Sequence, residues 1–200
     1  MSSINQKKSG RVYRKVKVCV SRRVIVIRGE IDVSMFAVLA IELATLQYCN
    51  LRPIVVIIKN SPGGDLFAST LIYMVLRESI APVYTVIEDR AASAAVYVFL
   101  GGTKRFMVNG ARLITHHSRS RRHRTSSLTP TERELILQEH RNKAIRILRR
   151  VLGISVTEAR NYALSTNSLS ARRARQTGFA TQIISQKRLQ NFYNNLSENL

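Results

Sequence analysis

Short runs of β-branched residues alternate along this chain with longer helical stretches. The run RVIVIRGEID at residues 23–32 predicts a strand. Residues 33–50 have apolar side chains all round a helical wheel, which predicts a helix with a wide buried face. A second strand is predicted at Ile54–Ile58 and a second helix around Leu66–Leu76.

The alternation continues through the middle of the chain. A third strand is predicted at Pro82–Ile87, and a helix rich in small residues follows in EDRAASAAVYVFLGG, residues 88–102. Two extended pieces come next, KRFMVN at 104–109 and RLITHH at 112–117. Strands that alternate with helices predict βαβ units and a mainly parallel sheet, so the fold class is α/β.

Two capping boxes mark helix starts in the last third of the chain. Thr129 is followed by Pro130 and, three residues on, by Glu132, which is typical of an N-cap with a first-turn proline. This helix is predicted to run to about Leu152 and to end at Gly153. The segment SVTE at residues 155–158 begins another helix in the same way.

Two adjacent glycines, Gly63 and Gly64, follow the strand Ile54–Ile58 in the pentapeptide NSPGG. Adjacent glycines cost backbone entropy, and a chain gains from them where the backbone turns sharply or approaches something closely. A plain strand-to-helix turn and a backbone that approaches a ligand both account for this pair. The pentapeptide alone leaves the two open.

The composition bounds the class of protein. With 200 residues, of which 45% are apolar, the chain fits one globular domain, and no apolar run approaches the ~20 residues of a membrane helix. The N-terminus lacks the apolar core of a secretory signal, whereas a short transit-type leader stays open. Cys19 and Cys49 form no C-x-x-C or Cys/His cluster, so we expect no metal, no disulfide framework and a reducing compartment.

The net charge of +20 sits on the flanks of the chain. Residues 1–23 carry eight Lys/Arg and no acid, residues 24–118 carry eight against seven, and residues 119–175 carry fourteen against four. The basic segment SRSRRHRTSS, residues 118–127, predicts an exposed loop. It has no interleaved aromatic residues and matches no nucleic-acid-binding motif, which favours a solvated or partner-facing loop.

Candidate chemistry follows three of the predicted strands, namely Gly63–Gly64, Ser93 and His116–His117. Ligands gather at the carboxyl ends of strands in α/β sheets. Ser93 stands among alanines near a predicted helix N-terminus, which favours developing negative charge. A histidine at another strand end can activate a serine hydroxyl, and glycine amides can bind an oxyanion. Small-residue packing, a surface histidine pair and a plain turn explain each feature singly, but their joint order favours the catalytic interpretation.

These segments resemble the proteolytic subunit of the Clp protease, ClpP, in the crotonase-like superfamily, from about Arg23 to Ile184. The motifs that carry the resemblance are RVIVIRGEID, KNSPGG, AAS at 91–93, GGTKR at 101–105, ARLITHH, and LSARRARQTGF near the end. The resemblance implies a spiral core of repeated β-β-α (βαβ) units with a helical handle extension.

The resemblance also divides the chain into four parts. It implies a basic N-terminal extension at 1–22, an α/β head at 23–118 and 153–186, a basic loop and handle helix at 119–152, and a C-terminal tail at 187–200.

Carried over to this chain, the family's motifs imply that Ser93 is the nucleophile and His116 the general base. The backbone N–H groups of Gly64 and Ala94 would form the oxyanion hole, with Gly63 supporting the turn. His117 falls where the family usually has glutamine.

The third triad residue departs from the family. An aspartate is expected at about Thr166 or Asn167, and neither is acidic. Losing such an aspartate has cost about 10⁴ in rate elsewhere. Asn167 is the candidate to orient a neutral His116 without supplying charge.

The resemblance implies two heptameric rings joined by their handles, an enclosed chamber, and an AAA+ unfoldase that feeds it with unfolded polypeptide. No metal or organic cofactor is implied. Arginines at 119–124 would repel their symmetry mates at a ring contact unless acidic subunits face them, which favours paralogous partner subunits or altered ring pairing over a simple homo-oligomer. The bacterial cytoplasm, a plastid stroma and a phage-infected cell stay open as compartments.

The predicted function is therefore a serine endopeptidase subunit with activity weakened by the missing aspartate. A catalytically inactive ring subunit is the alternative. A nucleic-acid-binding protein would use the basic flanks but would leave the Ser/His/Gly-Gly arrangement unexplained. An acyl-CoA enzyme of the crotonase type is disfavoured by the serine and histidine at protease positions.

Overall fold

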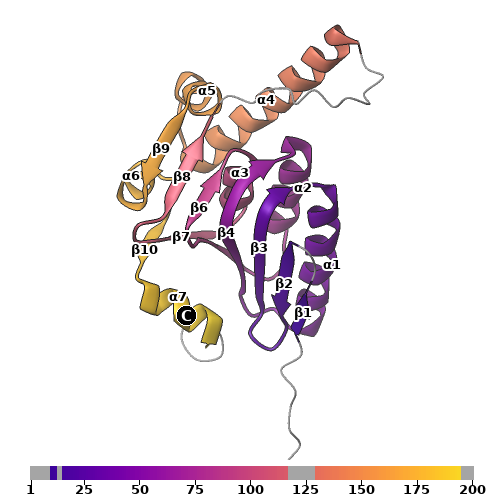
Figure 1. The fold of residues 1–200 in the computed structure, drawn as a ribbon, viewed down its shortest axis with the longest axis vertical. Coiled ribbons are helices and arrows are strands. Elements are labelled where there is room, and N and C mark those ends of the chain that lie inside the picture. The colour runs from indigo at the N-terminus through magenta and orange to yellow at the C-terminus, as the bar shows by residue number, and fades with distance from the viewer. Residues whose placement is uncertain (1–9, 13–14, 117–128, 195–200) are drawn as a thin grey trace, which may run out of the picture.

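The computed structural model describes residues 10–12, 15–116 and 129–194, and these residues form a ten-stranded sheet (Figure 1). Seven strands follow one another in space in the order β1-β2-β3-β4-β5-β7-β10. Their bounds are β1 Gly10–Val12, β2 Val16–Cys19, β3 Val24–Ile31, β4 Ile54–Gly64, β5 Val83–Ile87, β7 Lys104–Val108 and β10 Gln182–Ile184. From β3 to β10 every pair on this path is parallel, which confirms the predicted α/β class.

The three remaining strands branch from the end of β4. They are β6 Arg90–Ala92, β8 Arg112–Thr115 and β9 Asn167–Ser170. The first part of β4, Ile54–Ile58, pairs with β5, whereas Ser61 further along β4 pairs with Ala91 of β6. β6 pairs in parallel with β8, and β8 pairs antiparallel with β9. The sheet therefore divides along β4, and the site described below lies in the smaller branch.

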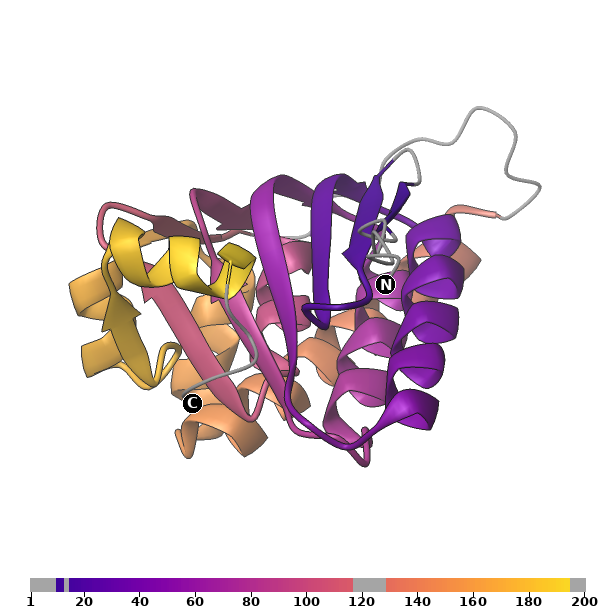
Figure 2. The same cartoon turned by 90° about the horizontal axis from the view of Figure 1, so that it is seen from below.

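The helices cover this curled sheet. Their bounds are α1 Val33–Cys49, α2 Leu66–Arg77, α3 Ala94–Leu100, α4 Pro130–Leu152, α5 Val156–Leu164, α6 Ala171–Gln176 and α7 Gln186–Asn194. Figure 2 shows α1 standing beside the strands as an outer layer. Between the layers lies one continuous apolar core, to which β3, β4 and β5 contribute wholly buried Val and Ile side chains.

The helix α4 is built as its capping signals predict. Thr129 accepts a hydrogen bond from the Glu132 N–H, the Glu132 side chain accepts from the Thr129 N–H, and Gly153 ends the helix in the left-handed region. Ser155 and Glu158 form the same box at α5. The second half of α4 buries a face against the head, whereas its first half projects away from the body of the molecule (Figure 1).

Most predicted elements are confirmed, and two need correction. Arg90–Ala92 is the strand β6, so the small-residue helix begins only at Ala94. The strand predicted to end at Ile58 continues through the Gly-Gly pair to Gly64. Strands β1, β2, β9 and β10 and helices α6 and α7 had no predicted counterpart. The basic segment at 118–127 and His117 lie outside the described residues, and the division of the chain into extension, head, handle and tail stays a prediction.

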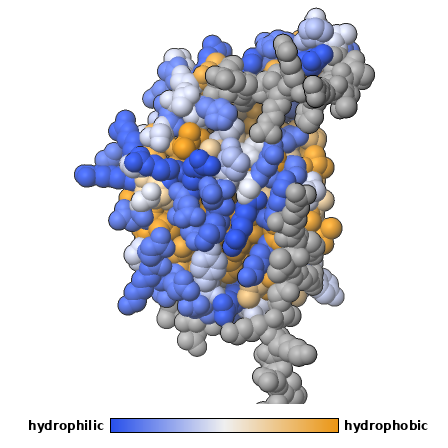
Figure 3. Space-filling view, viewed as in Figure 1, coloured by the Kyte–Doolittle hydropathy of each residue, from blue (hydrophilic) through white to orange (hydrophobic). Residues whose placement is uncertain are grey.

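The outer helices expose apolar surface. α1 buries Met35, Leu39, Leu43 and Leu46 against the core, but Ile41 on its outer side is 61% exposed. The expected wide buried face is thus only one side of the helix within a single chain. Figure 3 shows the sheet side as mostly hydrophilic, with apolar residues gathered along the edge where α1 lies. Among the described residues, no helix has the length and apolar character needed to cross a membrane.

Candidate active site

Ser93 occupies a sharp turn between the strand β6 and the helix α3. It is the N-cap of α3, with φ 54° and ψ −123°, and its side chain makes no capping hydrogen bond. Its backbone is held on both sides, because its N–H donates to the Ile114 carbonyl (2.8 Å) and its carbonyl accepts from the Val96 N–H (3.0 Å). A positive φ is strained for a residue with a side chain and is found where the surrounding structure enforces it. Such a strand-to-helix turn presents a half-buried hydroxyl beside a helix N-terminus.

Gly63 packs directly against this turn. A Cβ on Gly63 would lie 2.6 Å from the Ala92 carbonyl oxygen, 2.6 Å from the Ser93 Cβ and 2.9 Å from the Ala94 nitrogen. The first N–H groups of a helix have no carbonyl partner within it, and α3 begins at Ala94. The end of β4 and the first amide of α3 therefore meet beside Ser93.

Gly64 meets a different neighbour. A Cβ on Gly64 would lie 2.2 Å from the Ile31 carbonyl oxygen and 2.8 Å from the Glu30 Cγ. The missing side chain thus lets β4 lie close against the end of β3. At both glycines the missing side chain lets the backbone pack against other segments of this chain, and whether it also approaches a ligand stays a prediction.

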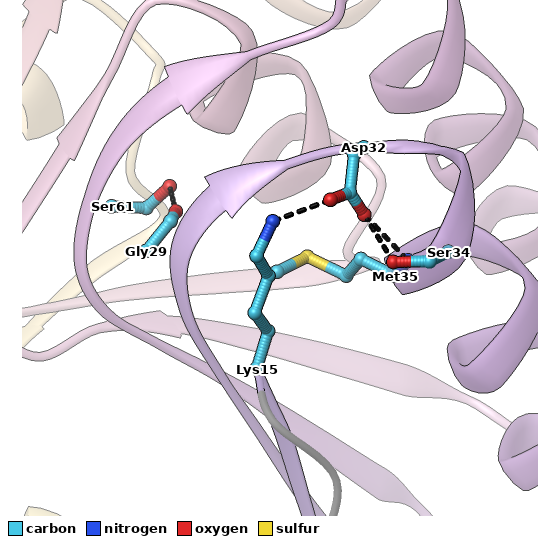
Figure 4. Close-up of polar contacts among 6 residues, drawn as sticks. All are labelled: Lys15, Gly29, Asp32, Ser34, Met35 and Ser61. Atoms are coloured by element: carbon cyan, nitrogen blue, oxygen red, sulfur yellow. Dashed lines mark hydrogen bonds and ion pairs between the residues drawn. The ribbon is translucent and has the colours of Figure 1, made fainter.

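Ser61 holds the glycine segment in place. Its buried hydroxyl donates to the Gly29 carbonyl (2.6 Å), as Figure 4 shows, and accepts from the Gly63 N–H (3.3 Å). Directly after the glycines, the Asp65 N–H donates to the Ile31 carbonyl (2.8 Å), and the Asp65 side chain caps α2. The backbone around Gly63 is therefore held by hydrogen bonds to β3 and by the capped start of α2 that follows it.

His116 follows the last residue of β8 and is half-buried. Ala92 of β6 pairs with Ile114 of β8 in parallel. Ser93 and His116 therefore stand just past the carboxyl ends of two neighbouring strands, one residue and two residues beyond that pair. The serine and the histidine thus come to the same edge of the sheet.

Asn167 begins β9 and pairs with Thr115, the residue before His116. Its side-chain amide nitrogen donates to the Thr115 hydroxyl (3.1 Å) and to the Ser165 carbonyl (3.1 Å). Thr115 is 5% exposed, and its hydroxyl also lies 3.4 Å from the Ser165 carbonyl. Sequence reasoning missed Thr115 and Ser61, because a threonine or serine in a strand carries no local signal of such a role.

The aspartates of the chain serve other positions. Asp32 and Asp65 cap α1 and α2. Asp89 precedes β6, and its carbonyl accepts from the Arg112 N–H (2.8 Å) at the end of β6 and β8 away from His116. Within the described part of the chain, no group of three His, Cys, Asp or Glu side chains could hold a metal ion. The chemical groups at this edge are thus a hydroxyl, an imidazole, amides and a helix N-terminus, which together suit acyl transfer.

Comparison with solved structures places the fold. ClpP1 from Listeria monocytogenes matches with a TM-score of 0.72 at 22% identity, over 84% of this chain and 94% of that one. An asparagine-to-aspartate mutant of the same ClpP1 matches with a TM-score of 0.73 at 22% identity, over 84% and 95%. Likeness at this identity shows that the two chains share a fold.

Comparison with curated proteins gives partial and near-complete matches. The ATP-dependent Clp protease proteolytic subunit 1 of Rhodopirellula baltica is 31% identical over 96 residues, or 47% of this chain and 42% of that protein. In that match and two similar ones, the chain spans about half the length of the curated relative or less. Proteolytic subunit 2 of Streptomyces avermitilis is 29% identical over 181 residues, or 82% of this chain and 90% of that protein.

The family model described as Clp protease matches residues 6–187, which include every residue of the candidate site. The fold, the two capping-box helices and the serine, histidine and glycine positions all lie inside that match. The chain belongs to the Clp protease family.

Proposed function

We propose that this chain is a serine-type endopeptidase subunit that hydrolyses unfolded polypeptides within an oligomeric chamber. The observation that carries the proposal is the turn at Ser93. Its strained backbone, the contact with Gly63 and the adjacent start of α3 support the proposal of a nucleophile beside amide donors. His116 stands past the end of the next strand. A serine that served only to pack a small-residue helix would need none of these features.

The proposed reaction begins with attack of the Ser93 Oγ on a peptide carbonyl while His116 takes the hydroxyl proton. Negative charge then develops on the carbonyl oxygen, where the N–H groups of Gly64 and Ala94, supported by Gly63, would stabilise it. His116 returns the proton to the leaving amine, and an acyl-enzyme remains. Water, activated by the same histidine, hydrolyses this ester and releases the carboxylic acid.

Asn167 is proposed to orient His116 without supplying charge. A carboxylate facing the histidine, as in an intact triad, would also stabilise the imidazolium that forms during attack. An asparagine offers hydrogen bonds alone, so the proposed activity is weaker than that of an intact triad. No metal or organic cofactor enters any step.

The proposed assembly is a ring of this chain with itself or with paralogous subunits, two rings being joined through α4. Exposed apolar residues of α1, of α2 and of the turn after α2 support association, because Ile41, Met74 and Ile80 are 61%, 45% and 78% exposed in the single chain. Exposed apolar patches of this kind mark protein–protein contacts. An AAA+ unfoldase would supply substrate to the chamber, and the compartment would be the cytoplasm or a plastid stroma.

A ring subunit without activity is the second candidate. It is favoured by one observation, that the positions before β9 carry no carboxylate and that Asp32, Asp65 and Asp89 serve elsewhere. In that case the chain would shape the chamber while other subunits cleave.

Labelling with a fluorophosphonate serine-hydrolase probe separates the two candidates. The protein is labelled alone and in the assembled ring with its native partner subunits, next to Ser93→Ala and the control Ser79→Ala, which lies beyond the end of α2. Labelling that is lost in Ser93→Ala and kept in Ser79→Ala supports the peptidase. No labelling of this chain in a ring whose other subunits react would overturn the peptidase and leave the structural subunit.

A further inference from the structure

The amide of Asn167 is committed to two acceptors on the side of Thr115. Both hydrogen bonds leave from its side-chain nitrogen, one to the Thr115 hydroxyl (3.1 Å) and one to the Ser165 carbonyl (3.1 Å). An amide nitrogen has two hydrogens, so these bonds use its full donor capacity. Asn167 thereby ties the start of β9 to the last residue of β8.

The register of the same ladder sets another residue across from His116. β8 and β9 lie side by side (Figure 1), with Ile114 opposite Ser168 and Thr115 opposite Asn167. One step further along this antiparallel register, the facing residues are His116 and Thr166. Thr166 is exposed, and its hydroxyl makes no hydrogen bond with any residue that the structure describes.

We infer that Asn167 is a positioning residue that acts on His116 through Thr115, and that Thr166 occupies the place across from the imidazole. The inference rests on the proposed function and assigns its third residue. Asn167 holds the end of β8, from which His116 extends, while position 166 faces the histidine without a charged group. The aspartate that the resemblance leads us to expect is thus missing at position 166 and not at position 167.

The chemistry of the two positions predicts opposite responses to a carboxylate. At position 167, aspartate would lose the donor and set an oxygen against the Ser165 carbonyl, which is also an acceptor, so the ends of β8 and β9 would separate. At position 166, aspartate would lie at an exposed place across from the imidazole, where a negative charge stabilises its protonated form. We call the two hydrogen bonds from Asn167 to Thr115 and Ser165 the clamp. Asn167→Asp breaks this clamp, whereas Thr166→Asp supplies the missing charge.

Four variants of the full-length protein, assembled with its partners, test this assignment. We expect Thr166→Asp to raise the rate of fluorophosphonate labelling at Ser93 by about tenfold or more, given the ~10⁴ effect of such a carboxylate elsewhere. It should also move the midpoint of the labelling-versus-pH curve upward, because a nearby carboxylate raises the pKa of an imidazole. A change that merely stabilised the fold would leave this midpoint in place. Asn167→Asp should slow labelling by about tenfold.

Thr115→Val and Thr115→Ser form the matched pair for the clamp. Valine keeps the shape of threonine but removes the oxygen that accepts from Asn167, whereas serine keeps it. We expect valine to slow labelling and to speed amide hydrogen exchange in β8 and β9, and serine to stay close to the wild type in both measurements. Hydrogen exchange needs no activity, so it judges the clamp even if the chain is never labelled.

The outcomes separate the inference from the proposed function. One outcome is that neither wild type nor Thr166→Asp is labelled while amide hydrogen exchange is faster in Thr115→Val and Asn167→Asp. That outcome would contradict the proposed peptidase and support the clamp. Asn167→Asp labelling faster than Thr166→Asp, with exchange in β9 unchanged, would overturn the inference and leave the peptidase in place. Unchanged exchange in Thr115→Val overturns the clamp in any case.

Discussion

Gly63 and Ser93 touch so closely that a Cβ added to Gly63 would lie 2.6 Å from the Cβ of Ser93. The same atom would lie 2.6 Å from the Ala92 carbonyl oxygen. Carbon atoms that are not bonded prefer separations near 3.5–4.0 Å. The contact is therefore possible only without a side chain at position 63.

Gly63→Ala should abolish probe labelling at Ser93, because the turn that presents the hydroxyl must move to admit the methyl group. The matched control is Gly110→Ala in the β7–β8 turn, where φ is +93° against +95° at Gly63, but nothing lies within 4 Å of an added Cβ. The control carries the backbone strain alone, roughly 1–2 kcal/mol, and should keep its labelling. Equal labelling of Gly63→Ala and wild type would contradict the arrangement.

Arg23→Lys should destabilise the protein although the charge is kept. Arg23 is 2% exposed, and its guanidinium donates to the carbonyls of Leu46 (2.6 Å), Asn50 (2.9 Å), Arg52 (2.8 Å) and Pro53 (3.3 Å) around the end of α1. Burial, assisted by the nearby charge of Arg52, lowers the pKa of this group. A lysine ammonium cannot reproduce the planar fork of donors and would leave carbonyls unpaired.

We expect a loss of about 2–4 kcal/mol in the free energy of unfolding for Arg23→Lys, measured by urea titration. Arg172→Lys on the exposed side of α6 is the control and should stay within about 0.5 kcal/mol of wild type. A similar midpoint for both variants would show that the carbonyl contacts of Arg23 contribute little.

Tyr193→Phe should loosen the last helix without unfolding the head. The Tyr193 hydroxyl donates to the Glu88 carboxylate, which also receives Lys59, and Phe192 packs on Phe106 with ring centroids 5.5 Å apart. Burial, and then the hydrogen bond and charge of Glu88, raise the pKa of Tyr193, so its hydroxyl stays a donor at physiological pH. Removing it leaves Glu88 with one donor fewer.

Amide hydrogen exchange across α7 measures this effect. We expect faster exchange in Tyr193→Phe, corresponding to a local loss of about 1–3 kcal/mol for a hydrogen bond to a charged group. Tyr48→Phe is the control, since Tyr48 is 95% exposed. Exchange in α7 that is the same in both variants would argue that the aromatic contact alone holds the helix.

Acid should reduce the free energy of unfolding that Asp32 contributes, over the pH range between the unfolded and folded pKa values of its carboxyl group. Burial pushes the pKa of Asp32 upward, but hydrogen bonds from Lys15, Ser34 and the Met35 N–H outweigh it and lower the pKa from 3.8 to about 2 (Figure 4). In that window the unfolded chain binds more protons than the folded one, so stability falls as the pH falls. The contribution is complete above pH 3.8 and is lost as the pH passes through about 2.

Urea midpoints measured from about pH 5 to about pH 2, on either side of this window, test the assignment. Asp32→Asn should flatten the acid dependence, and Lys15→Met should flatten it in part by removing one donor. The carboxylate is 39% exposed, so solvent screening keeps the effect modest. An acid slope that is unchanged in Asp32→Asn would assign the sensitivity to other carboxylates.

Local signals in the sequence predicted most of this fold. The capping boxes at Thr129 and Ser155 act within three residues, and the buried runs at β3, β4 and β5 are continuous and β-branched, so neighbouring residues alone determine these elements. β6 could not be predicted in this way. Alanine favours helices, and Arg90–Ala92 is extended only because β4 and β8 pair with it on both sides.

The site was predictable in part for the same reason. The places of Ser93 and His116 follow from the order of strands, since each residue comes directly after a strand. The bond between Asn167 and Thr115 joins residues 52 positions apart and depends on the register of β8 with β9. No pattern in either segment specifies that register, so the clamp appears only in three dimensions.

The pairing of β8 with β9 also has a consequence for the order in which a newly synthesised chain matures. Ser93 and His116 are made 74 and 51 residues before Asn167, so both leave the ribosome at a time when the outer edge of β8 has no neighbour in the sheet. An open strand edge of this kind invites pairing with other chains until its own partner arrives. Because β9 is the last strand to reach the candidate site, a nascent chain or one cut before β9 lacks the finished edge of that site. For the proposed peptidase, this order would delay hydrolysis until the strand that completes the site has arrived.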